Sequence, residues 1–254
     1  MYNPEDEMTG HSHVASSALA REGFAGAGND TFAASNGTPV QRIRMLMGGK
    51  YRDTYLKLEG ANPGGSIKYR TAQSLLQSLE TTGKLSAGGR LVESSSGNLA
   101  IGLAMLARQR GFQFNAVVDP KVTAENIHRL HQLGAVTHMV ERPDESGGYL
   151  LSRLARVREM LAEDPGLLWT NQYRNEANPL AHYLGTAPEL FLQMERKVDA
   201  VFVAVSTGGT LAGISRYFRE ASPETRIIAV DARGSVALGG APAERKLVGI
   251  GSSQ

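Results

Sequence analysis

From residue 54 onward, short apolar segments alternate with segments in which apolar residues recur every three or four positions. The short segments predict strands and the periodic ones predict helices with one apolar face. The predicted strands cover residues 54–58, 90–93, 114–119, 136–140, 199–205 and 226–231. The predicted helices comprise a stripe over 72–79 that ends near Gly83, helices over 98–110, 124–133, 149–161 and 210–220, and a helix that begins at Asn178-Pro179. Strands that alternate with helices indicate an α/β fold with mainly parallel sheets. Because segment 199–205 is almost continuously apolar, we expect both faces of that strand to be covered.

The first 35 residues lack this pattern and are rich in Ala, Gly and Ser. We expect residues 1–35 to form a tail that adds little to a core, with a short docking helix over 14–21 as the alternative. His11 and His13 form an H-x-H pair in this tail. Because the tail has no third histidine, we interpret them as a solvated pair and expect no metal site.

Composition and charge narrow the class of protein. The chain has 254 residues, of which 41% are hydrophobic and 20% charged, as in ordinary soluble domains. A net charge of +2 without a dense basic block does not predict nucleic-acid binding. The absence of cysteine excludes disulfides, thiolate metal ligands and a cysteine nucleophile. No apolar segment reaches membrane-spanning length and no signal peptide is evident, so we expect a cytoplasmic protein that does not bind membranes.

Three glycine-rich turns lie between a predicted strand and a predicted helix. They are NPGGSIK (62–68), ESSSGN (93–98) and STGGT (206–210). In open α/β sheets, ligands bind beyond the carboxyl ends of the strands, where such turns lie. The 206–210 turn combines two glycines with three hydroxyl side chains and suits a phosphate, although a tight connection would have the same composition. It matches neither the Walker pattern nor G-x-G-x-x-G, so a nicotinamide dehydrogenase is disfavoured.

Two of these turns contain residues that have either a chemical role or an ordinary structural role. Lys68 is either a solvated lysine or an amine whose pKa is lowered in a desolvated pocket, where it forms a Schiff base. A cation in the first helical turn is disfavoured by the helix dipole, which favours the second interpretation. Ser95, Ser96 and Asn98 form either a carboxylate-binding loop or a plain helix cap.

Taken together and in this order, the three turns resemble those of the fold-type II pyridoxal-phosphate enzymes of the cysteine synthase family. The resemblance begins near NGTPVQRI at residue 36 and runs to the end of the chain. It implies a two-domain fold of the tryptophan synthase β type, with a cofactor-phosphate domain (36–61 and 176–254) and a substrate domain (62–175) that has a mobile part. It also implies pyridoxal 5'-phosphate as cofactor, small amino acids as substrates and a homodimer. The resemblance implies that Lys68 attaches the cofactor and that Asn98 forms a hydrogen bond to the cofactor's phenolic oxygen. It implies that the substrate carboxylate is bound by Ser95, Ser96, Gly97 and Gln172. It implies that the cofactor phosphate is bound by Ser206, Thr207, Gly208, Gly209 and Thr210.

A finer resemblance points to the diaminopropionate branch of this family, which serves siderophore and peptide-antibiotic biosynthesis. Its segments here include ESSSGNLAIGLAMLA, TNQYRNEAN and VDARGSVALGG. It implies a β-replacement in which O-phospho-L-serine loses phosphate and gains the amine of L-glutamate. Ser206, where cysteine synthases commonly have glycine, and Tyr149 would add hydrogen-bonding groups for an amino-acid nucleophile; plain phosphate binding and helix-start packing are the alternatives. A cysteine synthase that uses O-acetylserine or O-phosphoserine with sulfide is the second interpretation.

Two departures from the family pattern bear on activity. Tyr69 follows the lysine where the family usually has Asp, and acidic residues are favoured at a helix start. The family also continues past the region of Gly251, with a segment that supplies a Ser or Thr facing the pyridine nitrogen. We therefore expect the large domain to be incomplete at its C-terminal end, with an exposed sheet edge. An inactive, truncated paralogue with a binding role is a third interpretation.

Overall fold

The structure of the protein is a computed structural model. It describes residues 37–252 except 146, 246 and 248. The predicted tail, with its docking helix over 14–21 and its pair of histidines, lies outside the described residues.

The described elements follow the predicted alternation of strands and helices. The strands are β1 (Val40–Met47), β2 (Lys50–Lys57), β3 (Arg90–Ser94), β4 (Gln113–Val118), β5 (Val136–Met139), β6 (Leu167–Trp169), β7 (Ala200–Ala204) and β8 (Arg226–Val230). The helices are α2 (Lys68–Thr81), α3 (Asn98–Arg110), α4 (Ala124–Gln132), α5 (Leu150–Glu163), α6 (Ala177–Ala181), α7 (Ala187–Gln193) and α8 (Gly209–Ala221), with a 3-10 turn η1 (Glu59–Ala61) and a π-helical segment η2 (His182–Thr186). The predicted α/β class is confirmed.

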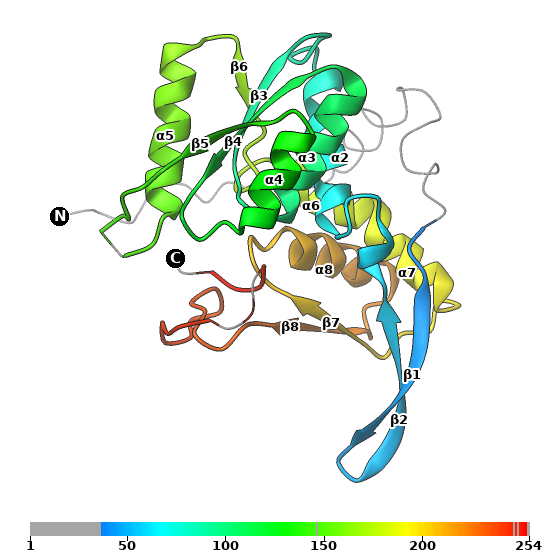
Figure 1. Cartoon of the computed structure of the whole chain (residues 1–254). Coiled ribbons are helices and arrows are strands. Elements are labelled where there is room, and N and C mark those ends of the chain that lie inside the picture. The colour runs from blue at the N-terminus through cyan, green and yellow to red at the C-terminus, as the bar shows by residue number, and fades with distance from the viewer. Residues whose placement is uncertain (1–36, 146, 246, 248, 253–254) are drawn as a thin grey trace, which may run out of the picture. The chain divides into compact units, whose positions relative to one another are not determined.

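A four-stranded parallel sheet in the order β5-β4-β3-β6 forms the first layer of the fold. Leu91 and Phe114 on one face join a core with α2, α3 and α4, whereas Val92 and Val117 on the other face pack with Val157 of α5. The sheet therefore lies between helices on both faces (Figure 1). Because its strands are parallel, the turn after β3 lies at their carboxyl ends, where ligands are expected.

A second sheet consists of β7 and β8, which pair in parallel. Val201 and Val203 pack against Ile214 and Phe218 of α8, while Phe202 between them is 63% exposed. The expectation that both faces of this strand are covered is therefore wrong for the described part of the chain, because alternate side chains point to opposite faces and only one face meets a helix. The proposed boundaries between a cofactor-phosphate domain and a substrate domain stay a prediction.

An antiparallel hairpin, β1–β2, precedes both sheets. The predicted strand over 54–58 is the end of β2, and β1 was not predicted. The turn between the two strands is formed by Gly48 and Gly49, whose φ angles of +58° and +75° are unfavourable for other residues. The hairpin leads the chain directly into the turn that carries Lys68.

Candidate active site

Lys68 is the first residue of α2 and follows the tight turn at its N-terminus. Gly65 adopts a left-handed φ of +74°, and its N–H donates to the carbonyl of Asn62 at 2.7 Å. The backbone N–H of Lys68 donates to Oγ of Ser66 at 3.1 Å, which ends the turn and starts the helix. The Nζ atom of Lys68 lies 3.4 Å from Oγ1 of Thr207. The structure thus brings together two of the three predicted turns, from positions 139 residues apart.

The amine of Lys68 has an altered protonation equilibrium. Burial lowers its pKa, and the negative charge of Glu93 opposes that change. A lowered pKa makes the neutral amine more available, and only the neutral amine is a nucleophile. This supports the interpretation of Lys68 as a reactive amine.

The turn between β7 and α8 has the features of an anion site. Gly208 caps α8 with a left-handed φ of +87°, and a Cβ there would meet no atom within 4 Å. A Cβ at Gly209 would lie 2.3 Å from Oδ1 of Asn178, so only glycine lets the turn approach α6 so closely. The first N–H groups of α8 lack partners within the helix, which makes the start of the helix suited to an anion.

The hydroxyl side chains of this turn contact different neighbours. Oγ of Ser206 donates to the carbonyl of Gly251 at 3.4 Å. Oγ1 of Thr207 accepts from Nδ2 of Asn178 at 3.3 Å, and Oγ1 of Thr210 lies 3.2 Å from Nε2 of His182. Asn178 and His182 were not identified from the sequence, although their spacing of four residues on a helical segment places both on one face.

The turn after β3 contains the predicted carboxylate-binding residues. Oγ of Ser95 accepts the N–H of Ala100 at 3.3 Å and so satisfies a first-turn donor of α3, whose N-cap residue is Gly97. Oγ of Ser96 accepts from Nη1 of Arg153 at 3.3 Å. A Cβ at Gly97 would meet no atom within 4 Å, and Asn98, the first residue of α3, is exposed. The turn therefore combines a helix cap with an open side, as a ligand loop requires, and the role of Asn98 stays a prediction.

Glu93 is a fully buried carboxylate directly before this turn. It accepts hydrogen bonds from Oγ1 of Thr170 at 2.6 Å and from the backbone N–H of Gln172 at 3.0 Å. Nε2 of Gln172 in turn donates to the carbonyl of Ser94 at 3.2 Å. Burial raises the pKa of Glu93, while its hydrogen bonds oppose the rise. Glu93, not identified from the sequence, thus fixes Gln172 beside the turn after β3, and the role of Gln172 in substrate binding stays a prediction.

Helix α5 brings a cation to the same loop. Besides Ser96, Nη1 of Arg153 contacts Oδ2 of Asp119 at 3.1 Å, in a pair whose side chains are only 13% and 7% exposed. Nε of Arg153 is buried without a hydrogen-bond partner in the described part of the protein. Tyr149, at the start of α5, has its ring 5.5 Å from Nζ of Lys121, and its predicted place beside the cleft stays a prediction.

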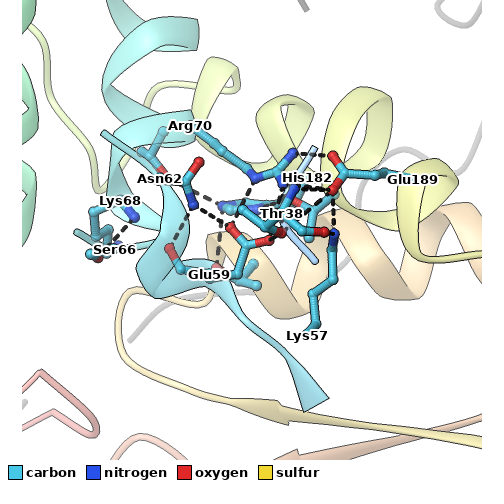
Figure 2. A network of polar contacts seen from close by, with 12 residues as sticks. Thr38, Lys57, Glu59, Asn62, Ser66, Lys68, Arg70, His182 and Glu189 are labelled. Atoms are coloured by element: carbon cyan, nitrogen blue, oxygen red, sulfur yellow. Dashed lines mark hydrogen bonds and ion pairs between the residues drawn. The ribbon is translucent and has the colours of Figure 1, made fainter. Parts of the chain in front are cut away.

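A network of buried ion pairs surrounds the start of α2 (Figure 2). Arg70 is 6% exposed and donates to Glu59 at 2.8 Å and to Glu189 at 2.7 Å. Lys57 also pairs with Glu189, so two cations face two anions. The network ties the segment before Lys68 to α7 and holds α2 in place from its first turn.

Tyr69, which replaces the acidic residue of the family pattern, does not disrupt the start of α2. The helix begins at Lys68 without an acidic residue in its first turn. The Tyr69 side chain packs against the main core, and a Cβ at Gly64 would lie 3.1 Å from its ring. The ring therefore covers the glycine turn and contributes packing in place of charge.

Among the residues that the structure describes, no three His, Asp or Glu side chains group closely enough to hold a metal ion. None of the described helices is both long and apolar enough to cross a bilayer.

Comparison with known proteins identifies relatives along most of the chain. A protein from Ralstonia nicotianae named N-(2-amino-2-carboxyethyl)-L-glutamate synthase is 44% identical over 218 residues, covering 86% of this chain and 64% of the relative. A protein of the same name from Cupriavidus metallidurans is 41% identical over 226 residues, covering 89% of this chain and 66% of the relative. The chain thus spans just under two thirds of the length of these curated relatives.

The fold also matches solved structures. The O-acetylserine dependent cystathionine beta-synthase from Helicobacter pylori superposes with a TM-score of 0.76 at 30% identity, over 85% of this chain and 70% of that one. The sequence profile described as pyridoxal-phosphate dependent enzyme matches residues 32–253. The chain therefore belongs to the family of pyridoxal-phosphate dependent enzymes.

Proposed function

We propose that the protein to which this chain belongs is a β-replacement synthase that converts O-phospho-L-serine and L-glutamate to N-(2-amino-2-carboxyethyl)-L-glutamate and phosphate. The names of both curated relatives support this reaction. Nζ of Lys68 contacts Oγ1 of Thr207 in the 206–210 turn, which supports one site that holds both the aldehyde and the phosphate of the cofactor. Homodimer assembly remains a prediction from the family resemblance, and a cytoplasmic location remains a prediction from the sequence pattern.

The residues of the site fit pyridoxal phosphate. A phosphate needs N–H and O–H donors, which the start of α8, Ser206, Thr207 and Thr210 provide. The open space beside Gly208 leaves room for such a group. An aldehyde needs a neutral amine, which the lowered pKa of Lys68 favours. When bound, pyridoxal phosphate supplies an electron sink for negative charge that develops on the substrate α-carbon.

The remaining steps fall to the side chains of the protein. We assign to the Ser95–Gly97 loop the binding of the substrate α-carboxylate, and to Nζ of Lys68 the removal of the α-proton. Phosphate then leaves from the β-carbon with the electrons of the broken C–O bond, and the amine nitrogen of glutamate forms a bond to that carbon and loses a proton. Nζ of Lys68 finally returns a proton to the α-carbon. Exclusion of water from the loop protects the β-carbon from competing hydrolysis.

The position of Arg153 is the observation that favours an anionic amino acid over sulfide as the second substrate. Nη1 of Arg153 donates to Oγ of Ser96 at 3.3 Å, so a positive charge lies beside the loop. A side-chain carboxylate of the second substrate would pair with this guanidinium in the planar two-bond geometry that the two groups form, which sulfide cannot adopt.

The test is phosphate release from O-phospho-L-serine by the cofactor-loaded protein, with L-glutamate or with sulfide as the second substrate. We expect release to depend on glutamate and the product to be N-(2-amino-2-carboxyethyl)-L-glutamate by mass spectrometry. Dependence on sulfide alone would establish a cysteine synthase, and cofactor binding without turnover of either would establish an inactive paralogue.

A matched variant separates the role of Arg153 from a general loss of activity. Arg153→Gln should raise the KM for glutamate by at least about tenfold, the equivalent of one charge-assisted hydrogen bond, and leave cofactor binding unchanged. Lys121→Gln, which removes a cation from the neighbouring Tyr149 ring, is the control and should leave that KM within twofold. Equal effects of the two variants would contradict the role given to Arg153.

A further inference from the structure

His182 contacts three threonine hydroxyls from three different segments. It is the first residue of the π-helical segment η2 and is fully buried. Its Nδ1 lies 3.0 Å from Oγ1 of Thr186, and its Nε2 lies 3.2 Å from Oγ1 of both Thr71 and Thr210. Thr71 belongs to the helix of Lys68, and Thr210 to the phosphate turn. The ring therefore connects the two segments that would hold the cofactor (Figure 2 shows its place near Lys68 and Arg70).

The ring is neutral at physiological pH. Burial and the positive charges of Lys68 and Arg70 lower the pKa of His182 to about 3. A neutral imidazole carries one N–H and one acceptor nitrogen, so the position of that single proton decides the direction of all three hydrogen bonds.

The neighbouring Asn178 fixes this direction. Its Nδ2 donates to the backbone carbonyl of Gln172 at 2.8 Å, which can only accept, so its Oδ1 is the atom that faces Thr71. Oγ1 of Thr71 lies 3.4 Å from that oxygen, and its one proton is donated there. Thr71 must therefore accept a proton in its contact with His182, which places the ring proton on Nε2.

The same proton determines what Thr210 can do. Because Nε2 is a donor, it cannot take the hydroxyl proton of Thr210, and Thr210 accepts from it instead. The hydroxyl proton of Thr210 is then available to a ligand at the open side of the turn. With the proton on Nδ1, Nε2 would compete with a bound phosphate for that hydroxyl proton.

We propose that His182 is a positioning residue that, through its Nε2–H tautomer, directs the hydroxyl proton of Thr210 toward the cofactor phosphate. This inference rests on the assignment of residues 206–210 to the phosphate, and it does not depend on which nucleophile the enzyme uses. Loss of the ring should thus weaken binding of the phosphate group and leave the rest of the cofactor unaffected.

The first test is the tautomer itself. Nitrogen NMR of the full chain with ring-labelled histidine, assigned by the loss of one signal in His182→Gln, should show a protonated Nε2 and an unprotonated Nδ1 for His182, before and after addition of cofactor. A protonated Nδ1 would overturn the inference. This measurement uses the unmodified protein and is independent of catalytic activity.

The second test compares dissociation constants for pyridoxal phosphate and for pyridoxal, which lacks the phosphate. His182→Leu should weaken pyridoxal phosphate about tenfold, the size of one hydrogen bond to a charged group, and leave pyridoxal unchanged. His182→Gln should stay within about threefold of the unmodified protein, because its amide N–H can replace Nε2–H. Thr210→Val should match His182→Leu, and the double variant should show no further loss.

The results of these tests distinguish failure of the positioning role of His182 from failure of the cofactor site. Equal weakening of both ligands by His182→Leu, or additive losses in the double variant, would overturn the positioning role alone. An unmodified protein that bound neither ligand would overturn the cofactor site and, with it, this inference. If His182→Leu did not fold, the tautomer measurement and the comparison of His182→Gln with Thr210→Val would still decide.

Discussion

Nη1 of Arg70 donates to Oε2 of Glu189 at 2.7 Å, although 119 residues separate them along the chain. Glu189 also pairs with Lys57, and it accepts the backbone N–H of Thr38 at 2.8 Å. Although burial alone would raise its pKa, hydrogen bonds from Arg70 and Lys57 lower the pKa of Glu189 to about 2. Glu189 therefore remains charged at neutral pH and joins α7 to the helix that begins at Lys68.

Glu189→Gln should destabilise the fold markedly. The substitution keeps the shape but leaves Arg70 and Lys57 with only one carboxylate, and an uncompensated buried charge is expensive. We expect a loss of about 2 to 3 kcal/mol in the free energy of unfolding, less than for a wholly buried pair because the Glu189 side chain is 21% exposed. Urea denaturation followed by circular dichroism measures this loss.

The control for this substitution is Asp53→Asn in the β1–β2 hairpin. Asp53 pairs with Arg42 at 2.6 Å, but both side chains are exposed to water. Solvent screens such pairs, so no measurable change in the unfolding midpoint is expected. Similar losses for the two variants would show that the network around Arg70 is worth no more than a surface pair.

Much of the fold follows from local patterns in the sequence. The stretch that forms α3 has helical periodicity from Asn98 to Arg110, and the structure gives the same bounds. Strand β6 has three residues, too few to establish a period, and was not predicted. Strand β1 contains two arginines and is largely exposed, so it lacks the apolar character of a core strand. The π-helical geometry of η2 has no local sequence pattern, because it depends on the packing of His182 against other segments.

The site was predictable in part for the same reason. Glycine turns at strand ends are a local feature, and they led to Lys68 and to residues 206–210. The roles of Glu93, Arg153 and His182 depend chiefly on partners that lie 28 to 111 residues away in the sequence, as in the contact of His182 with Thr71. A single sequence does not reveal such partners. The family resemblance added Gln172, which the structure places beside the loop, and Tyr149, whose role is still a prediction.

Glu93→Gln should change the titration of Lys68. The negative charge of Glu93 raises the pKa of Lys68, so its removal should lower that pKa further below the usual lysine value. The rate at which cofactor-free protein binds pyridoxal phosphate covalently should therefore rise at lower pH than in the unmodified protein. Absorbance after mixing, recorded from neutral to alkaline pH, gives the midpoint.

Glu80→Gln is the matched control for that shift. Glu80 lies near the other end of α2, where it pairs with Arg110 at 2.5 Å. Its removal deletes the same charge as Glu93→Gln, but from the far end of the helix that begins at Lys68, so the midpoint should not move. A midpoint that moved upward in Glu93→Gln, or equally in both variants, would contradict the coupling of Glu93 to Lys68.

Protonation of His182 should destabilise the protein in acid. Its pKa of about 3 in the folded protein lies below the ordinary value of 6.5, so the unfolded chain binds the proton first as the pH falls. Stability is therefore complete above pH 6.5 and decreases as the pH falls toward 3. Between pH 6.5 and 5 the free energy of unfolding should fall by about 2 kcal/mol from this group alone.

Urea titrations at several pH values isolate this contribution. His182→Gln removes the titrating ring and should reduce the dependence over this window, before protonation of Glu189 begins to contribute. Burial also lowers the pKa of His138, so the contribution of that residue remains. His128→Gln, which removes an exposed histidine of α4, is the matched control for the loss of a histidine. If the slope of His182→Gln equals that of the unmodified protein, His182 is not held neutral by the fold.

Gly213→Ala should separate α8 from the segment that carries His182. A Cβ at Gly213 would lie 2.2 Å from the carbonyl oxygen of Pro179 and 2.8 Å from the backbone nitrogen of Tyr183, and backbone atoms cannot rotate away. Overpacking of this kind costs about 1 to 3 kcal/mol, and the gain in helix propensity offsets up to about 1 kcal/mol.

The glycine at position 102 in α3 provides the control, because a Cβ there would meet the Ala72 methyl at 3.2 Å, which small shifts can relieve. We expect Gly213→Ala to lower both the unfolding midpoint and the affinity for pyridoxal phosphate, while Gly102→Ala changes neither by a comparable amount. The turn to which we assign the phosphate leads into α8, and α8 packs against η2. Equal behaviour of the two variants would therefore mean that this close approach does not position the site.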